Sequence, residues 1–314
     1  MGIKGFSESP NVWNAVSVGF LATTVGAVGS IGLGTLGYSL VEAQAFTTRF
    51  GQVQVLPEGS ADLKVLHLSD LHITPAQTRK INWVRSLGEL EPDLVVVTGD
   101  FMAHKLAVPA VIESLGSLLD RPGVFVLGSN DYFAPVIKSP FMYFDKDRRI
   151  KAEGAELPTQ DLVDELVNYG WIDLDNKQDR LNVNGIQIHA RGTDDPHIKK
   201  DRYELVAGQY DQGAFALGVT HAPYTRVLKQ FAQDNTDLIL AGHTHGGQIC
   251  IPFYGALVTN CDLPTGQAKG LSTFDCEGKQ TPLHVSAGVG TSPFTPIRLA
   301  CRPEATLLTL TAKS

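Results

Sequence analysis

The sequence predicts an α/β fold, because short apolar runs alternate with segments of helical periodicity from about residue 50 onward. The clearest runs are Leu63–Leu68, Leu94–Thr98 and Val124–Leu127, and each is followed by glycine or polar residues. Apolar strands with helices between them are typical of a sheet that is buried on both faces. The polar residues that follow the strands are the second observation, because they also locate a candidate site.

The remaining elements follow from the same periodicity. Apolar residues on one side of a segment, such as Ile81 and Val84, predict a helix. The predicted helices are Arg79–Leu90, Leu106–Leu119, Thr159–Tyr169, Arg202–Gln209 and Tyr224–Ala232. The further predicted strands are Ile186–Ala190, Ala214–Thr220, Leu238–Ala241, Pro282–Ser286 and Thr306–Leu310. No repeat or linker divides this region, so residues 51–314 are predicted to form one domain.

The segment Tyr132–Pro158 departs from this regularity, because it is long and has no clear period. Its aromatic residues are followed by a group of basic residues. Loops of this length in a compact domain are usually functional or disordered. We expect a lid over the site or a surface that meets lipid headgroups, and a solvated loop is the alternative.

Composition excludes several classes of protein. The 314 residues are 43% hydrophobic and 19% charged, which excludes a disordered, collagenous or polytopic membrane chain. The net charge of −7 disfavours a nucleic-acid partner, which requires a cationic face. Four cysteines without a CxxC pattern predict buried free thiols, whereas one or two disulfides would imply an oxidising compartment.

Residues 1–50 form a separate N-terminal segment in this prediction. No charged residue occurs from Ser9 to Val41, which is long enough for a membrane-spanning helix. We therefore expect a single uncleaved hydrophobic anchor and a membrane-associated protein. A signal peptide cleaved after Ala45 and a buried helix of the soluble domain are the alternatives. Almost no charge asymmetry flanks the segment, so the side of the membrane is not fixed.

Polar residues follow five of the predicted strands. The carboxyl ends of strands line the ligand crevice of an open α/β sheet, so these residues are expected to converge on one edge. The residues that follow the strands are Asp70 and His72, Asp100, Asn130 and Asp131, His221, and His243 and His245. Carboxylate, amide and imidazole donors of this kind suit divalent transition metals. Two such metals clamp a phosphate and generate hydroxide at neutral pH.

These motifs resemble the signature of the calcineurin-like metallophosphoesterase superfamily, which is D-x-H, G-D, G-N-H-D/E, a lone His and G-H-x-H. The resemblance covers about Asp70 to His245, and the GHTHGGQ ending together with Gly288–Arg298 is most similar to the membrane-associated bacterial branch. It implies a four-layer αββα sandwich with a dinuclear metal centre. It also implies that Asp70, His72 and His245 hold one metal, that Asn130, His221 and His243 hold the other, and that Asp100 bridges them.

One motif departs from the family pattern, because Gly128-Ser129-Asn130-Asp131 stands where G-N-H-D is expected. A one-residue shift keeps Asn130 as the metal ligand and places Asp131 at the position of the catalytic histidine. The ungapped alternative makes Ser129 the ligand, and an amide oxygen is the better donor of the two. Either alignment lacks the imidazole that would protonate the leaving group, so Asp131 is predicted to take that role, with His104 as an alternative.

The sequence therefore predicts a metal-dependent phosphoester hydrolase. A phosphodiesterase is predicted rather than a monoesterase, because the alkoxide leaving group of a simple alkyl monoester needs the acid that the motif lacks. A hydroxide bridging two metal ions, of Mn, Fe or Zn, would attack phosphorus near Asp100. Asp131, Asn130 and His221 are the predicted catalytic residues. The substrate would be a small phosphoester or a lipid-linked one. A non-catalytic metal-binding scaffold and a nuclease are the alternatives.

The other histidines, His67, His189, His197 and His284, lack a partner motif and are interpreted as ordinary packed or surface residues.

Overall fold

The computed structural model describes residues 32–136 and 154–314. Within this part of the chain, two six-stranded sheets form a mixed α/β fold. The order of the first sheet is β1-β14-β2-β3-β4-β5, and the order of the second is β12-β13-β9-β8-β7-β6. The parallel strands β2, β3 and β4 lie in the first sheet, and β7, β8 and β9 lie in the second.

The strand bounds agree closely with the apolar runs. The first sheet consists of β1 Thr47–Leu56, β2 Leu63–Leu68, β3 Leu94–Thr98, β4 Gly123–Val126, β5 Ile172–Asp173 and β14 Glu304–Ala312. The second consists of β6 Gln178–Val183, β7 Ile186–Thr193, β8 Phe215–Thr220, β9 Leu238–Ala241, β12 Gly270–Cys276 and β13 Lys279–Val285. A small hairpin is formed by β10 Cys250–Ile251 and β11 Gly255–Ala256. All residues of β3, β8 and β9 are buried, as the apolar sequence predicts.

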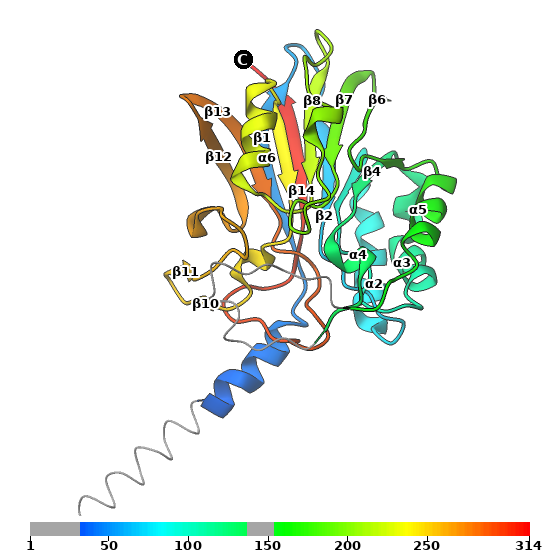
Figure 1. The fold of residues 1–314 in the computed structure, drawn as a ribbon, viewed down its shortest axis with the longest axis vertical. Coiled ribbons are helices and arrows are strands. Elements are labelled where there is room, and N and C mark those ends of the chain that lie inside the picture. The colour runs from blue at the N-terminus through cyan, green and yellow to red at the C-terminus, as the bar shows by residue number, and fades with distance from the viewer. Residues whose placement is uncertain (1–31, 137–153) are drawn as a thin grey trace, which may run out of the picture.

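Three apolar clusters define the layers. One packs the helices α2 Thr78–Ser86, α3 Val108–Leu115 and α5 Thr159–Asn168 against the first sheet. A second fills the space between the sheets, and a third packs α6 Thr225–Gln233 against β9, β12 and β13. Figure 1 shows α2, α3 and α5 together on one side of the molecule and α6 beside the other sheet. This arrangement is consistent with the αββα sandwich that the sequence resemblance implies.

Most predicted helices are present with small differences at their ends. The predicted Arg79–Leu90 and Leu106–Leu119 each continue from an α-helix into a 3-10 turn. The prediction for Arg202–Gln209 is wrong, because only the short turn Tyr203–Leu205 is helical there. Gly208 has φ of 132°, which is not helical, and the Arg191 guanidinium donates to the carbonyls of Gly208 and Gln209 at 2.7 and 2.5 Å, so this end of the segment follows an irregular path.

The N-terminal prediction is tested only in part. Residues 32–42 form a helix, and β1 crosses the predicted boundary at residue 50 and pairs with β14. No helix among the described residues is both long and apolar enough to span a bilayer. Residues 1–31 of the predicted anchor, and residues 137–153 of the predicted lid, lie outside the described residues.

The helix at residues 32–42 is attached to the domain at its carboxyl end. The Glu42 carboxylate accepts hydrogen bonds from the backbone N–H groups of Ala300 and Cys301, at 3.0 and 2.8 Å. The N–H of Arg298 donates to the Ser39 carbonyl at 3.0 Å. Both Ser39 and Glu42 are buried, so the helix end is fixed by the segment that precedes β14.

Candidate metal centre

The polar residues predicted from the strand ends converge in space. Asp70 and His72 follow β2, Asp100 follows β3, and His221 follows β8. His243 and His245 follow β9, which lies beside β8. Two sets of these residues place their ligand atoms within 4.8 Å of one another. The carboxyl ends of strands from both sheets therefore form one site.

The first set consists of Asp70, His72 and His245. The Nε2 atom of His245 lies 3.3 Å from Nε2 of His72 and 3.5 Å from Oδ1 of Asp70. Asp70 and His72 are buried, and His245 is partly accessible. The other oxygen of Asp70 accepts hydrogen bonds from Ser69 Oγ and from the His243 N–H, at 2.5 and 3.0 Å. These bonds fix one carboxylate oxygen of Asp70 and leave the other to face the histidines.

The second set consists of Asp70, Asp100 and His221. Oδ2 of Asp100 lies 3.6 Å from Nε2 of His221 and 3.5 Å from Nε2 of His72, so it faces both sets. Gly128 packs against Asp100 and His221, where the Cβ of any other residue would overlap both side chains. The sequence-predicted bridging position of Asp100 is consistent with this geometry.

Asn130 and His243 border the second set. The Asn130 side-chain amide donates to Asp100 Oδ2 at 2.7 Å, and its backbone N–H donates to Oδ1 at 2.8 Å. His243 Nδ1 lies 3.3 Å from His221 Nε2. The Asn130 side chain thus lies at the site and is bound to Asp100, and its role as a metal ligand stays a prediction of the one-residue shift.

Backbone conformation sets the direction of most of these side chains. Asp70, His72, Asp100, His243 and His245 all have φ between 44° and 68°, in the left-handed region. That region costs a non-glycine residue roughly 1–3 kcal/mol, so it persists only where the surroundings enforce it. Gly288 has φ of 72° and packs against the Asp70 side chain without a Cβ. Strain concentrated at the candidate ligands indicates a functional site.

The donors fit a divalent metal. Asp70 Oδ1 and His72 Nδ1 are buried, and neither has a hydrogen-bond partner among the described residues. A buried unpaired acceptor is costly, and coordination of a cation removes that cost for Asp70 Oδ1. Carboxylate and imidazole donors without thiolates suit Mn, Fe or Zn.

Charge in the site is divided between carboxylates and one imidazole. Burial raises the pKa of Asp70 to about 6, against the opposing effect of His221. Burial also opposes ionisation of Asp100, but His221 and His72 outweigh it and lower the Asp100 pKa. Burial disfavours the charged form of His221, yet the three carboxylates Asp100, Asp195 and Asp70 raise its pKa to about 9. Burial lowers the pKa of His72 to about 4, which leaves this ring neutral.

Two buried cations hold the loops of the first set. The Lys80 Nζ donates to the carbonyls of Leu71 and His72, at 2.8 and 3.1 Å. Burial lowers the pKa of this ammonium to about 7. Sequence reasoning missed Lys80, because a lysine in a helix has no signal that separates a buried one from a solvated one.

Arg298 is the second buried cation. Its guanidinium donates to the carbonyls of Ala287, Gly288 and Gly290 at 2.7, 3.1 and 2.7 Å, and to the His245 carbonyl at 3.4 Å. One side chain therefore connects the His245 loop to the loop that packs against Asp70. One sequence signal marks this residue, since it ends the segment Gly288–Arg298 that resembles the bacterial branch.

Asp131 holds the backbone next to the second set. Its Oδ2 accepts from the N–H groups of Asp100 and Gly128, at 2.8 and 3.0 Å. Its Oδ1 accepts from those of Phe101 and Met102, at 2.7 and 3.1 Å. Burial raises the pKa of Asp131 to about 8, and these amide bonds oppose that rise. Because both oxygens already face N–H donors, this geometry does not favour the leaving-group acid predicted at Asp131.

The loop after β7 adds side chains that the sequence did not indicate. The His197 ring lies 4.3 Å from the His243 ring, centroid to centroid, and its Nδ1 lies 2.9 Å from the Tyr224 hydroxyl. Asp195 is fully buried, and its Oδ2 has no partner among the described residues. A single histidine or aspartate in a loop is too common a feature to mark a site in sequence.

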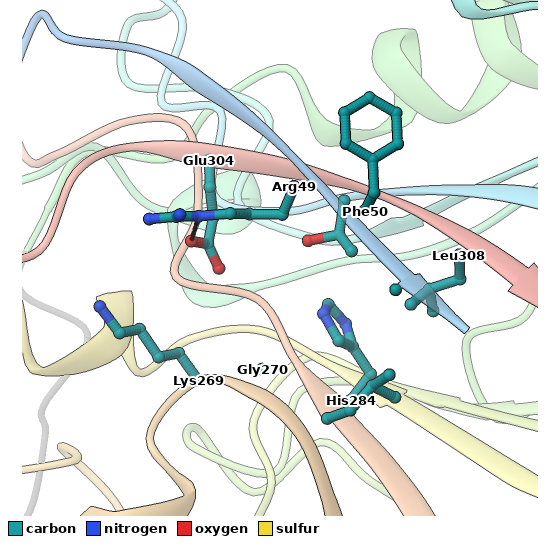
Figure 2. A pocket seen from close by; sticks show the side chains of 10 residues that line it. Arg49, Phe50, Lys269, Gly270, His284, Glu304 and Leu308 are labelled. Carbon is teal, nitrogen blue, oxygen red and sulfur yellow. Dashed lines mark hydrogen bonds and ion pairs between the residues drawn. The ribbon is translucent and has the colours of Figure 1, made fainter. Parts of the chain in front are cut away.

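A separate cleft lies away from these ligands. It has a volume of about 490 Å³ and is lined by residues of β1, β12, β13 and β14. Figure 2 shows Arg49 paired with Glu304 at this cleft, with Lys269 and His284 facing it and Phe50 directed away. His284 is buried, and its Nδ1 lies 2.8 Å from Nδ1 of His67. The interpretation of His67 as a packed core residue is therefore confirmed.

All four cysteines are free thiols.

Comparison with known proteins agrees with this geometry. The chain is 27% identical over 256 residues to the uncharacterized protein YpbG of Bacillus subtilis (strain 168), with 81% of this chain and 83% of that protein covered. It is 26% identical over 263 residues to the phosphodiesterase YaeI of Escherichia coli (strain K12), with 81% and 84% covered. It is 28% identical over 281 residues to a Bos taurus transmembrane protein with a metallophosphoesterase domain, covering 85% of this chain and 57% of that protein.

The family model of calcineurin-like phosphoesterases matches residues 63–247. This range begins at β2 and ends just after His245, so it contains every candidate ligand. The match covers more than half of the chain, and its limits agree with those of the strands that carry the site. The chain belongs to the calcineurin-like phosphoesterase family.

Proposed function

We propose that this protein is a metal-dependent phosphodiesterase with a dinuclear centre. The convergence of two ligand sets around Asp100, which faces both, is the observation that supports this function. Asp70, His72 and His245 would hold one ion, Asn130, His221 and His243 the other, and Asp100 both. When bound, such ions activate water at neutral pH and neutralise charge on phosphate oxygens.

The chain's own residues orient the substrate in this proposal. His197 and Tyr224 border His243 and are only partly buried, so both side chains are accessible to a phosphate bound at the site. Metal ligation requires the neutral form of His221, whose Nδ1 lies 2.6 Å from the Thr98 carbonyl and whose Nε2 faces Asp100. The bound ions would then stabilise the charge that develops on phosphorus-bound oxygens in the transition state.

The preference for diesters rests on the leaving group. The GSND motif lacks the family imidazole, and Asp131 directs both oxygens to backbone amides. Without a dedicated acid, the site suits a leaving group that needs little protonation, such as an aryl or phosphoryl group. The relative YaeI of Escherichia coli is named a phosphodiesterase, which supports the same choice.

Hydrolysis of bis-p-nitrophenyl phosphate by the full chain tests the proposal. We expect turnover that depends on added Mn²⁺ and falls at least about a thousandfold in Asp100→Asn, because that substitution removes the carboxylate that faces both ligand sets. Retention of the two metals without turnover on aryl or phosphoryl diesters would instead support the scaffold alternative.

A further inference from the structure

Exposed apolar side chains gather near the candidate metal centre. They belong to the hairpin β10–β11 with its flanks and to the loop before Arg298, and we call this surface the apolar tip: Ile249, Ile251, Phe253, Tyr254, Leu257 and Phe294. Phe253 has no protection from solvent, with a relative exposure of 110%, and Tyr254 is 76% exposed. Contiguous apolar patches of this kind on a protein surface mark a binding surface.

The two segments that form the tip carry no charge. Ala241–Cys261 and Ser286–Ile297 contain no Asp, Glu, Lys or Arg, although 19% of the whole chain is charged. A solvated loop or hairpin tip normally carries polar and charged side chains. The absence of charge from both segments therefore favours an apolar environment over water.

Hydrogen bonds join these segments into one surface. The Gln248 side-chain amide donates to the carbonyls of Thr295 and Ile297, at 3.0 and 3.1 Å. The backbone N–H of Cys250 donates to the Leu299 carbonyl at 2.8 Å, and Ile249 forms a parallel bridge with Leu299. The hairpin is therefore fixed relative to the loop that carries Phe294.

The helix at residues 32–42 is attached to the same body. Its exposed apolar side chains are Leu33, Leu36, Tyr38, Leu40 and Val41. Its carboxyl end is held by the bonds from Arg298, Ala300 and Cys301, next to the segment that pairs with the hairpin. Figure 1 shows this helix leaving the molecule at the same end as β10 and β11.

The chain that precedes this helix identifies the occupant of the surface. Residues 9–31 carry no charged side chain, and they lead directly into a helix whose exposed residues are apolar. A lipid bilayer accepts such a sequence, whereas an aqueous protein partner does not require one. A tip of aliphatic residues with Phe and Tyr has the composition of surfaces that enter the headgroup and acyl-chain boundary.

We propose that the apolar tip docks into the interfacial layer of a phospholipid bilayer, next to the helix at residues 32–42. The docked face includes the hairpin that begins a few residues after the ligand His245, and Arg298 bonds both to the His245 carbonyl and to the loop of the tip. The metal centre then lies close to the membrane plane. This position, which rests on the proposed function, assigns the substrate to phosphodiesters that carry a lipid group beside a leaving group that needs little protonation.

Fluorescence quenching in the full chain tests the docking. Phe253→Trp places an indole at the tip, and Tyr169→Trp places one at the opposite end of the parallel strands, where the chain enters β5. Tyr169 is a half-exposed aromatic residue, so it provides a matched control. Each variant is mixed with vesicles of phosphatidylcholine and phosphatidylglycerol brominated near the ester end of the acyl chains. The signal of the unsubstituted chain, which contains Trp13, Trp83 and Trp171, is subtracted.

We expect the Phe253→Trp emission to shift to shorter wavelength and to lose most of its intensity on brominated vesicles, while Tyr169→Trp is unchanged. Equal behaviour of the two variants would overturn the proposal. A shift that appears without vesicles and grows with protein concentration would also overturn it, because the tip would then be covered by a second copy of the chain.

A kinetic measurement tests the substrate class separately. Phe253→Ser is expected to lower the rate on a p-nitrophenyl phosphodiester of a long-chain alcohol in vesicles at least about tenfold and to leave the rate on bis-p-nitrophenyl phosphate unchanged, because only the first reaction needs docking. Equal rates on the lipid for both proteins would overturn the lipid assignment. If neither protein hydrolyses either compound, the proposed function fails, and the quenching result still decides the docking.

Discussion

The two ligand sets of the metal centre meet at Asp70 and Asp100, but side chains of opposite charge support them. The first set is backed by the cations Lys80 and Arg298, which hold its carbonyl groups. The second is backed by the carboxylate of Asp131, which holds the backbone of the Asp100 loop. Cations nearby weaken the binding of a metal ion. On the proposed function, we therefore expect the first set to bind its metal more weakly than the second and to depend on Arg298 mainly for its shape.

The largest expected effect is that of Arg298→Met. The substitution removes the donor of bonds to five backbone carbonyls, and buried carbonyls left without partners are costly. We expect a loss on the order of 3 kcal/mol in the free energy of unfolding, and a metal content that falls from two ions to one. Urea titration and elemental analysis measure the two quantities.

Arg302→Met is the matched control, because Arg302 is exposed and its Nε donates only to the Ala45 carbonyl in the described structure. It should change the unfolding free energy by less than about 0.5 kcal/mol. Loss of both metals together in Arg298→Met would contradict the assignment of Arg298 to the first set.

The Asp131→Asn variant tests the support of the second set. An amide group at this position turns an NH₂ group toward two backbone donors, so the Asp100 loop is expected to shift. We expect rates to fall about a hundredfold and by the same factor on aryl and alkyl phosphodiesters, because positioning rather than protonation is lost. Asp120→Asn, an exposed carboxylate at the end of a helical turn, is the control. A loss confined to alkyl esters would restore Asp131 as the leaving-group acid.

The smallest expected effect concerns the buried pair of rings His67 and His284. Burial lowers the pKa of His67 well below its usual value and that of His284 to about 4. The unfolded chain therefore binds protons near and below pH 6.5 that the folded chain does not bind. The free energy of unfolding is greatest above that pH and falls below it. Each ring contributes a slope of roughly 1.4 kcal/mol per pH unit between its folded and unfolded pKa values.

His284→Gln should remove about one ring's share of that slope in urea titrations between pH 7 and pH 5. His104→Gln provides the comparison, because His104 is exposed. An unchanged slope in His284→Gln would show that the pair does not couple folding to pH. The metal ligands do not complicate this comparison, since both variants retain them.

Much of the fold was predictable because buried strands have continuous apolar sequences. Leu63–Leu68, Leu94–Thr98 and Leu238–Ala241 have the bounds that their apolar runs predict. β1 and β12 were missed, because exposed edge strands alternate polar and apolar residues weakly. The helix predicted at Arg202–Gln209 is wrong, because Gly208 has a non-helical φ of 132° and a guanidinium from β7 holds the chain there in an irregular path.

The candidate ligands were predictable because each follows a strand, and strand ends meet in space. Their supports were not, because Lys80 and Arg298 act through carbonyl groups that any residue provides. Asp131 shows the same limit from another direction. Its type is that of an acid, but four backbone amides determine what it does, and no motif encodes their direction.

The left-handed backbone of five candidate ligands has a consequence for how this lineage can change. Glycine adopts that conformation without strain, so each of these positions would fold more readily with the residue that has no side chain. Selection for function must therefore act continually against selection for foldability at the same codons. A descendant that was no longer selected for catalysis would be expected to acquire glycine at Asp70, His72 or His243 first, and to become more stable as it lost activity.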